Sequence, residues 1–200
     1  MKQELNDCYY NINYINMKTS YVFFADGFEE VEALTCVDVM RRAGMPVVTV
    51  SINPVLDVTG AHGVTVVADS LFEDNDYSDA EWLVLPGGVP GAPNLLACEP
   101  LCDALLAQNE RGGKVAAICA SPSVVLAPLG ILSHRQAVCY PGMETPEGQV
   151  NWGNTRVAVD GNVVTGNGPA SAAPFALTIV AESLGREKAA EVASGMLQDY

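Results

Sequence analysis

The chain has 200 residues, enough for one domain with a full hydrophobic core. Its composition, 49% hydrophobic and 17% charged, is that of a globular rather than a disordered protein. The formal net charge of -14 argues against a surface for nucleic acid or an anionic membrane, and no apolar run is long enough to span a bilayer. His62 and His134 lie far apart and lack ligand spacing, so no metal site is predicted.

The first residues differ from the rest of the chain. Residues 1–18 are rich in Asn and Tyr, follow no helical period and contain no apolar stretch of the kind found in a secretory signal. We predict an N-terminal extension over 1–18 and a single domain over 19–200. Met17 is a candidate natural start, and an edge strand or a loosely docked tail is an equally good interpretation of the extension. Without a secretory signal, we predict a cytoplasmic chain with reduced cysteines.

The first half of the domain alternates short apolar runs with helical patterns. The Glu29-Glu30 pair favours a helix start, and Gly44 followed by Pro46 favours its end. The elements expected here are a strand over Tyr21–Ala25, a helix from about Glu29 to Gly44, a strand over Val47–Ile52, a hairpin of Val55–Val58 with Val64–Val67, a strand over Trp82–Leu85 and a helix over Leu95–Ala107.

The second half continues the same alternation. Asp160-Gly161 is a strong hairpin signal between two apolar runs. The elements expected are strands over Lys114–Ile118 and Arg135–Cys139, a hairpin of Arg156–Val159 with Asn162–Thr165, and helices over Ala172–Leu184 and Glu187–Leu197. Strands that alternate with helices through short links predict an α/β fold, with a mostly parallel sheet between helices.

Cys119 occupies the junction between a predicted buried strand and a predicted helix. Ser121 is a candidate N-cap of that helix, and Pro122 suits its first position. A tight turn at such a junction exposes one side chain above the carboxyl edge of the sheet, where the next N–H groups point at it. These groups favour a thiolate, which predicts a lowered pKa and a nucleophilic sulfur. An unreactive buried cysteine is an equally good interpretation of this stretch alone.

Two further segments end at the same predicted edge of the sheet. One brings Glu32, and the other brings the Gly87-Gly88 pair, whose backbone can approach another group closely. The N–H groups of Gly88 and Ala120 are candidate donors to an oxyanion or to the thiolate. A protonated Glu32 would donate a hydrogen bond to the Cys119 sulfur, so we predict that the two titrate as a unit with Glu32 carrying the proton.

Four ordered motifs resemble the ThiJ/PfpI superfamily, and most closely its branch of parkinsonism-associated deglycases and their bacterial relatives. They are FADGFEEVEA at 24–33, LVLPGG at 83–88, VAAICA at 115–120, and Gly168-Pro169 followed by FAL at 175–177. The resemblance covers Thr19 to the C-terminus. It implies a flavodoxin-like three-layer sandwich, of the class I glutamine amidotransferase type, and a homodimer.

The resemblance also implies roles for four residues. Cys119 would be the nucleophile, Glu32 its carboxyl partner, and Gly88 and Ala120 the backbone donors. The protease-like branch has a histidine where this chain has Ala120, so peptidase activity is not expected.

Three residues are candidate substrate contacts. Gly87 lies in the glycine pair, and Tyr140 stands where several relatives have a histidine near the site. A tyrosine can hydrogen-bond a substrate hydroxyl but is a poor base, since its ordinary pKa is about 10. His62 stands where some relatives carry a basic residue. A solvent-exposed histidine at a hairpin tip is the favoured alternative for it.

These residues support two functions from different classes. In the first, the chain is a cofactor-free enzyme of the glyoxalase or deglycase type. Cys119 attacks a 2-oxoaldehyde such as methylglyoxal, or its glycated adducts, Glu32 shuttles the proton, and a 2-hydroxy acid such as lactate is released. In the second, the chain is an oxidative-stress sensor or holdase chaperone in which Cys119 is oxidised to a sulfinate. A binding module with an unreactive Cys119 is the third possibility.

Overall fold

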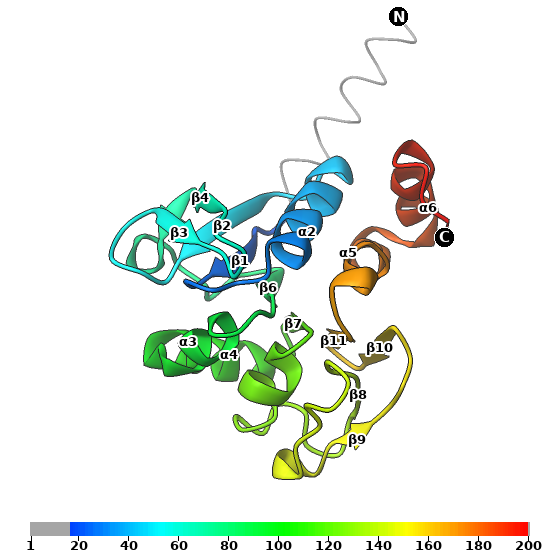
Figure 1. Cartoon of the computed structure of the whole chain (residues 1–200). Coiled ribbons are helices and arrows are strands. Elements are labelled where there is room, and N and C mark those ends of the chain that lie inside the picture. The colour runs from blue at the N-terminus through cyan, green and yellow to red at the C-terminus, as the bar shows by residue number, and fades with distance from the viewer. Residues whose placement is uncertain (1–16, 200) are drawn as a thin grey trace, which may run out of the picture.

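A seven-stranded sheet forms the centre of the chain in a computed structural model, which describes residues 17–199 (Figure 1). The strand order is β10-β11-β7-β6-β1-β2-β5. Every neighbouring pair is parallel except β10 with β11, which are antiparallel. The prediction for the N-terminal extension falls almost entirely on residues 1–16, which lie outside the described residues.

The elements have the following bounds. The strands of the central sheet are β1 (Ser20–Phe24), β2 (Val47–Ser51), β5 (Ser70–Leu71), β6 (Trp82–Leu85), β7 (Lys114–Ile118), β10 (Val157–Asp160) and β11 (Val163–Gly166). Two smaller pairs are β3 (Asp57–Thr59) with β4 (Thr65–Val67), antiparallel, and β8 (Gln136–Ala137) with β9 (Asn151–Trp152), parallel. The helices are α2 (Glu30–Arg42), α3 (Gly91–Ala97), α4 (Glu99–Glu110), α5 (Ala172–Leu184) and α6 (Arg186–Gly195).

Helices cover both faces of the sheet, which confirms the predicted α/β fold with three layers. In Figure 1, α2, α5 and α6 lie along one side of the sheet, and α3 and α4 lie along the other. All five helices are short, and no helix within residues 17–199 has the length and apolar character needed to cross a membrane.

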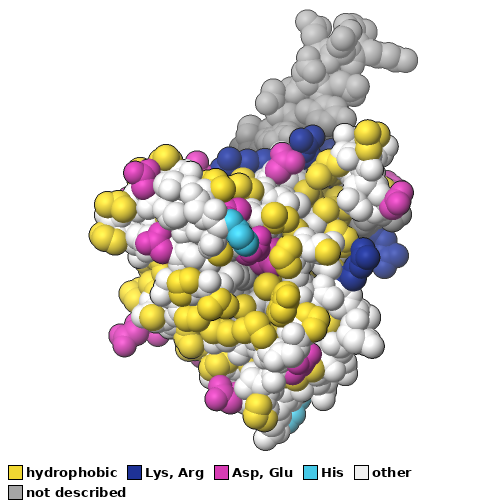
Figure 2. All heavy atoms as spheres, viewed as in Figure 1, with side chains coloured by type: hydrophobic (Ala, Val, Ile, Leu, Met, Phe, Trp, Pro, Cys, Tyr) yellow, Lys and Arg dark blue, Asp and Glu magenta, His cyan; other side chains and the backbone are white. Residues whose placement is uncertain are grey.

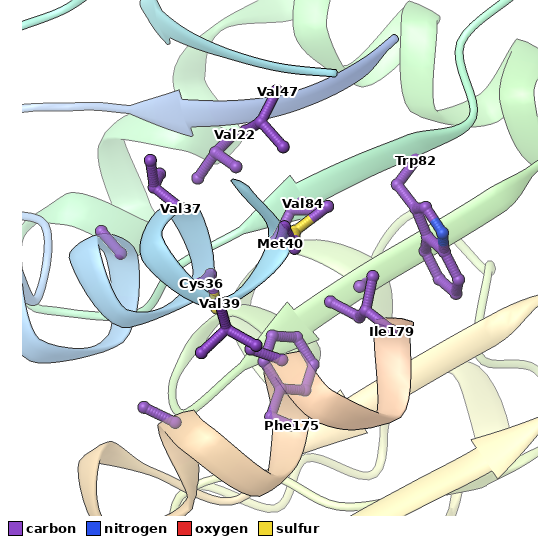
Figure 3. Close-up of a cluster of buried hydrophobic side chains, with 14 of the residues drawn as sticks. Val22, Cys36, Val37, Val39, Met40, Val47, Trp82, Val84, Phe175 and Ile179 are labelled. Carbon is purple, nitrogen blue, oxygen red and sulfur yellow. The ribbon is translucent and has the colours of Figure 1, made fainter. Parts of the chain in front are cut away.

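The strands supply side chains to both layers because successive residues point to opposite faces. In β1, Val22 and Phe24 pack toward α2 and α5, whereas Tyr21 and Phe23 pack toward α3 and α4. Figure 3 shows the first of these cores, where side chains of α2 and α5 meet over the strands. A sheet buried on both sides holds its strand ends rigidly, and the candidate site is built at those ends.

Two local predictions are wrong. The helix expected over Leu95–Ala107 is two helices, α3 and α4, which meet at Cys98. Pro100 lies in the first turn of α4, where its missing N–H costs nothing, but it could not continue a helix arriving from Leu95. Cys98 therefore stands at the N-cap position of α4.

Ser121 is also not an N-cap. Its backbone is already helical, and its hydroxyl accepts no hydrogen bond from the following turn but donates to the Pro86 carbonyl at 2.5 Å. This bond ties the segment after β7 to the segment after β6. The helical turn that follows covers Pro122–Leu126 and is wider than an α-helix, since the Ala127 N–H bonds to the Pro122 carbonyl.

Candidate active site

Cys119 follows β7 directly and has a left-handed backbone, with φ of +65°. Such a conformation costs a non-glycine residue of order 1 kcal/mol and needs support from its surroundings. The support comes from both sides: the Cys119 N–H donates to the Gly166 carbonyl at 2.9 Å, and the Cys119 carbonyl accepts from the Tyr140 N–H at 2.8 Å. The predicted sharp turn is therefore present, and it leaves Cys119 8% exposed.

Glu32 lies in the first turn of α2 and is fully buried. Its Oε2 accepts a hydrogen bond from the Gly87 N–H at 2.8 Å, whereas its Oε1 has no partner among the described residues. Burial raises the pKa of Glu32 to about 7, and the hydrogen bonds from Gly87 and Cys119 limit that rise. A carboxyl group with this pKa gains and loses a proton readily near neutral pH.

The glycine pair after β6 brings these two side chains together. A Cβ on Gly87 would lie 2.5 Å from the Cys119 Cβ, 2.7 Å from Glu32 Oε2 and 3.0 Å from the Cys119 sulfur. Gly88 has φ of +96°, and a Cβ there would lie 2.3 Å from the Gly27 carbonyl oxygen. The close backbone approach expected from the sequence is therefore present at both glycines, and any larger residue at position 87 would separate sulfur from carboxyl.

The surroundings of the sulfur act in two directions. Burial, together with the neighbouring Glu32 carboxylate, raises the pKa of Cys119 to about 12. The backbone N–H groups of Gly88 and Ala120 lower the same pKa. The expectation of a lowered pKa for Cys119 is therefore wrong in its net direction, because desolvation at 8% exposure outweighs the effect of the two backbone groups.

Cys119 and Glu32 form one buried, coupled pair. Each side chain affects the pKa of the other, and Glu32, which has the lower pKa, releases its proton first, near pH 7. The proton that remains is therefore on the Cys119 thiol, whereas the sequence predicted it on Glu32. From that pH upward the pair carries a single negative charge and retains one proton. The Gly88 and Ala120 donors favour the charge on sulfur, and the Gly87 donor favours it on the carboxylate.

Tyr140 lies close to Cys119 through its backbone rather than through its hydroxyl. Its side chain is about half exposed, and its ring lies beside Gly168, where an added Cβ would be 3.4 Å from the ring. The structure thus places Tyr140 next to the Cys119 turn and leaves its role as a substrate contact as a prediction.

His62 lies at the tip of the β3–β4 hairpin, where it is bound to acidic side chains. Its Nδ1 lies 2.8 Å from Glu30 Oε2 and 3.6 Å from Glu29 Oε2, and its backbone N–H donates to Glu30 Oε1 at 2.8 Å. The hydrogen bond to Glu30 raises the pKa of the imidazole. The ligand atoms of these three residues lie within 4.8 Å of one another, but Nδ1 is committed to Glu30, so we assign no metal site there.

From the sequence, Glu29 and Glu30 are expected only at a helix start. In the structure the β3–β4 hairpin returns to cover them, a contact between residues more than thirty positions apart. The contact from Ser121 to Pro86 was also not predicted. No local sequence signal marks either contact. The contact of the hairpin with Glu29 and Glu30 arises only because the hairpin lies above the strand ends.

The fold and site define a class of protein: an α/β sandwich with a cysteine on a strained turn at the carboxyl end of a central parallel strand, paired with a buried acid. Within that class, the chain belongs to the DJ-1/PfpI family, whose family model matches residues 18–182. The resemblance inferred from the sequence motifs is thereby confirmed.

Several named relatives share most of the chain. Protein dj-1beta of Drosophila melanogaster is 36% identical over 186 residues, which cover 92% of this chain and 98% of the relative. A Caenorhabditis elegans relative, glutathione-independent glyoxalase DJR-1.2, is 33% identical over 80% of this chain and 85% of its own length. DJ-1 homolog B of Arabidopsis thaliana is 37% identical over 86% of this chain, and the match spans only 40% of that longer protein.

Solved structures agree with this assignment. The oxidized form of DJ-1 from Toxoplasma gondii superposes with a TM-score of 0.86 at 34% identity, over 92% of this chain and 100% of the other. Drosophila melanogaster DJ-1beta gives a TM-score of 0.85 at 37% identity, with the same coverage of both chains.

Proposed function

We propose that this protein converts small 2-oxoaldehydes, such as methylglyoxal, into 2-hydroxy acids without a cofactor. The observation that carries the proposal is the pairing of Cys119 with the buried Glu32, beside two backbone donors, at a turn held from both sides. The C. elegans relative named as a glutathione-independent glyoxalase supports it.

The first step is addition of the Cys119 thiol across the aldehyde carbonyl. A carbon–sulfur bond forms while the carbonyl π bond breaks, and Glu32 takes the thiol proton. The developing oxyanion is stabilised by the N–H groups of Gly88 and Ala120, the same groups that lower the pKa of Cys119. Return of the proton from Glu32 to that oxygen gives a hemithioacetal and restores the carboxylate.

The second step is an internal redox reaction. Glu32 removes the proton from the former aldehyde carbon, and the same proton equivalent is delivered to the neighbouring ketone carbon through an enediol. The first carbon is thus oxidised to a thioester and the second reduced to an alcohol, so no external oxidant or reductant is needed. Water then hydrolyses the thioester, which releases the 2-hydroxy acid and regenerates the thiol. The overall change is addition of one water to methylglyoxal to give lactate.

The direct test is a product assay on the full chain. Purified protein is incubated with methylglyoxal, and both aldehyde loss and lactate formation are followed for the native chain and for Cys119→Ser. We expect equal amounts of aldehyde consumed and lactate formed by the native chain, and background rates for the variant. Aldehyde loss without lactate in the native chain, or equal rates in both proteins, would overturn the proposed function.

A second candidate function uses the same sulfur as an oxidative-stress sensor or holdase switch. The two N–H donors at Cys119 suit the negative oxygens of a sulfinate, and the matching Toxoplasma gondii structure is of an oxidized DJ-1. Two equivalents of peroxide would convert the thiol to a sulfinate with release of two waters. Mild peroxide followed by peptide mass mapping tests this: oxidation must reach Cys119 before the buried Cys36 and Cys139.

We further propose a cytoplasmic homodimer. Proteins of this family are commonly dimeric. In this chain, large apolar side chains are exposed on α2, at Val31 and Leu34, and on the β3–β4 hairpin, at Val64 and Val67. Exposed apolar side chains favour association. A mass in solution of twice 21.1 kDa at micromolar concentration is expected, and a monomer mass would contradict the proposal.

A further inference from the structure

The Cys119–Glu32 pair has an acidic neighbour, which we call the acidic rim: Glu29, Glu30 and His62. Glu29 immediately precedes α2 and stands one turn before Glu32. Its backbone N–H donates to the Gly87 carbonyl at 3.0 Å, so it lies against the glycine that separates sulfur from carboxyl. Its charge acts on Glu32, whose pKa it raises.

The hairpin tip locks the rim in place. Glu30 accepts hydrogen bonds from the backbone N–H groups of His62, at 2.8 Å, and Val64, at 3.3 Å, and its other oxygen lies 2.8 Å from the imidazole. The side chains of Glu29 and Glu30 are only 13% and 9% exposed, whereas that of His62 is 70% exposed. The Glu30 carboxylate is therefore held in place by hydrogen bonds, and both carboxylates lie in partly desolvated surroundings, where charge acts more strongly than in water.

Within residues 17–199, no lysine or arginine forms an ion pair that would neutralise Glu29 or Glu30. The only ion pairs of these two carboxylates among the described residues are those with His62. The cations that form ion pairs do so elsewhere, at Lys18, Arg41, Arg42, Lys114 and Lys188. In Figure 2, a histidine and acidic side chains lie beside a central depression, whereas the visible Lys and Arg side chains lie toward the margins.

We infer that the acidic rim makes the Cys119 site selective for uncharged 2-oxoaldehydes over those that carry a carboxylate, with Glu29 as the specificity-determining residue. The inference rests on the proposed function and defines its substrate class. Even when His62 is protonated, two rim carboxylates and the charge of the Cys119–Glu32 pair outnumber one imidazolium. An anionic substrate must therefore approach against a net negative field, whereas an uncharged one is not opposed.

A matched pair of substrates tests the inference. The two are 4-carboxyphenylglyoxal and its methyl ester, which share the reacting group and differ in one charge. The quantity measured is the ratio of kcat/KM for ester to acid, in the native chain, in Glu29→Gln and in Glu110→Gln. Glu110 is the control position: it ends α4 and lies before the N-terminal end of β7, whereas Cys119 follows the C-terminal end of β7. Glu110→Gln therefore removes one negative charge at the opposite edge of the sheet. Because a ratio is compared between proteins, any effect of Glu29→Gln that is the same for both substrates cancels.

We expect a ratio of at least about 10 in the native chain, which corresponds to about 1.4 kcal/mol. Glu29→Gln should reduce it severalfold, Glu110→Gln should leave it unchanged, and added salt should reduce the native ratio. A native ratio near unity, or equal effects of the two variants, would overturn the inference while leaving the proposed function intact. If neither substrate is consumed faster than by Cys119→Ser, the proposed function itself fails, and the inference fails with it.

Discussion

Cys36 and Cys119 lie on either side of Glu32, and both are buried, at 1% and 8% exposure. Cys36 stands one turn after Glu32 on α2, within the core formed by α2 and α5 (Figure 3). Burial raises its pKa above the ordinary value, and the charge of Glu32 raises it further. Cys119 has the same two influences on its pKa, but the N–H groups of Gly88 and Ala120 oppose them.

The comparison separates burial from reactivity. Burial beside an acid makes a cysteine harder to ionise in both places, so neither property marks a nucleophile. What distinguishes Cys119 is the left-handed turn, two backbone N–H groups that lower its pKa, and a slightly larger exposure to solvent. Reactivity is therefore expected to follow the turn and its donors.

Removing each thiol should give the largest difference. Cys119→Ala is expected to lower the rate of methylglyoxal conversion by at least about a thousandfold, because the covalent step is lost. Cys36→Ala should keep the rate within a few-fold and cost about 1–2 kcal/mol of stability, since a core side chain is truncated. Steady-state kinetics and urea unfolding on the two variants check this. Comparable losses of activity in both would remove the distinction between the two cysteines.

The free energy of unfolding should depend on pH because the pKa of Glu32 is raised in the folded chain. This pKa is about 7 in the folded chain against 4.5 as the ordinary value, so the folded chain holds this proton more tightly than the unfolded chain does. Its stabilisation is therefore complete below the unfolded pKa and is lost as pH rises to about 7, a decline of ~3 kcal/mol.

The check is urea unfolding of the native chain and of Glu32→Gln across this pH range. The free energy of unfolding of the native chain should fall relative to the variant, which has no proton to release at this position. Two curves that stay parallel would show that Glu32 titrates normally.

Gly87→Ala should separate the Cys119 and Glu32 side chains although neither of these residues is substituted. The added methyl would lie 2.5 Å from the Cys119 Cβ, so sulfur and carboxyl must move apart, at a cost of about 1–3 kcal/mol and a loss of activity of tens-fold. Gly195→Ala is the matched control, since nothing lies within 4 Å of an added Cβ there. If the two substitutions have the same effect on activity, the close contact at Gly87 has no functional role.

Tyr140→Phe should have the smallest effect. The Tyr140 backbone supports the Cys119 turn, and that bond survives the change, while the side chain is 47% exposed. We expect kcat to change by less than about threefold and any larger effect to fall on KM, where loss of a substrate hydrogen bond would appear. A drop in kcat of a hundredfold would instead make the hydroxyl part of the proton transfer.

The sequence predicted most of the fold because its signals are local. Apolar runs of four or five residues, such as Trp82–Leu85 and Lys114–Ile118, are strands, and the Asp160-Gly161 hairpin is present. The single helix expected after Leu95 failed because an apolar period continues through a break that only Pro100 marks. The strand β5 was not predicted, and β8 is two residues long where a strand over Arg135–Cys139 was expected, since two residues carry no period.

The site was predictable in its members but not in its electrostatics. Strand ends that meet at one edge bring Glu32, Gly88 and Cys119 together, which sequence order is enough to suggest. The raised pKa of Cys119 depends on how much water reaches the sulfur, and the Glu30–His62 contact depends on where a distant hairpin folds back. Neither quantity is encoded in a short motif.

The central claim is that Cys119 and Glu32 share one proton. The most direct test is the rate of Cys119 alkylation by iodoacetamide as a function of pH, followed by peptide mass in the native chain and in Glu32→Leu. We predict that the native profile rises only well above pH 7, because burial and the Glu32 carboxylate raise the pKa of Cys119, and that it moves downward by at least about one unit in the variant, which lacks the carboxylate. Identical profiles in the two proteins would contradict the pairing.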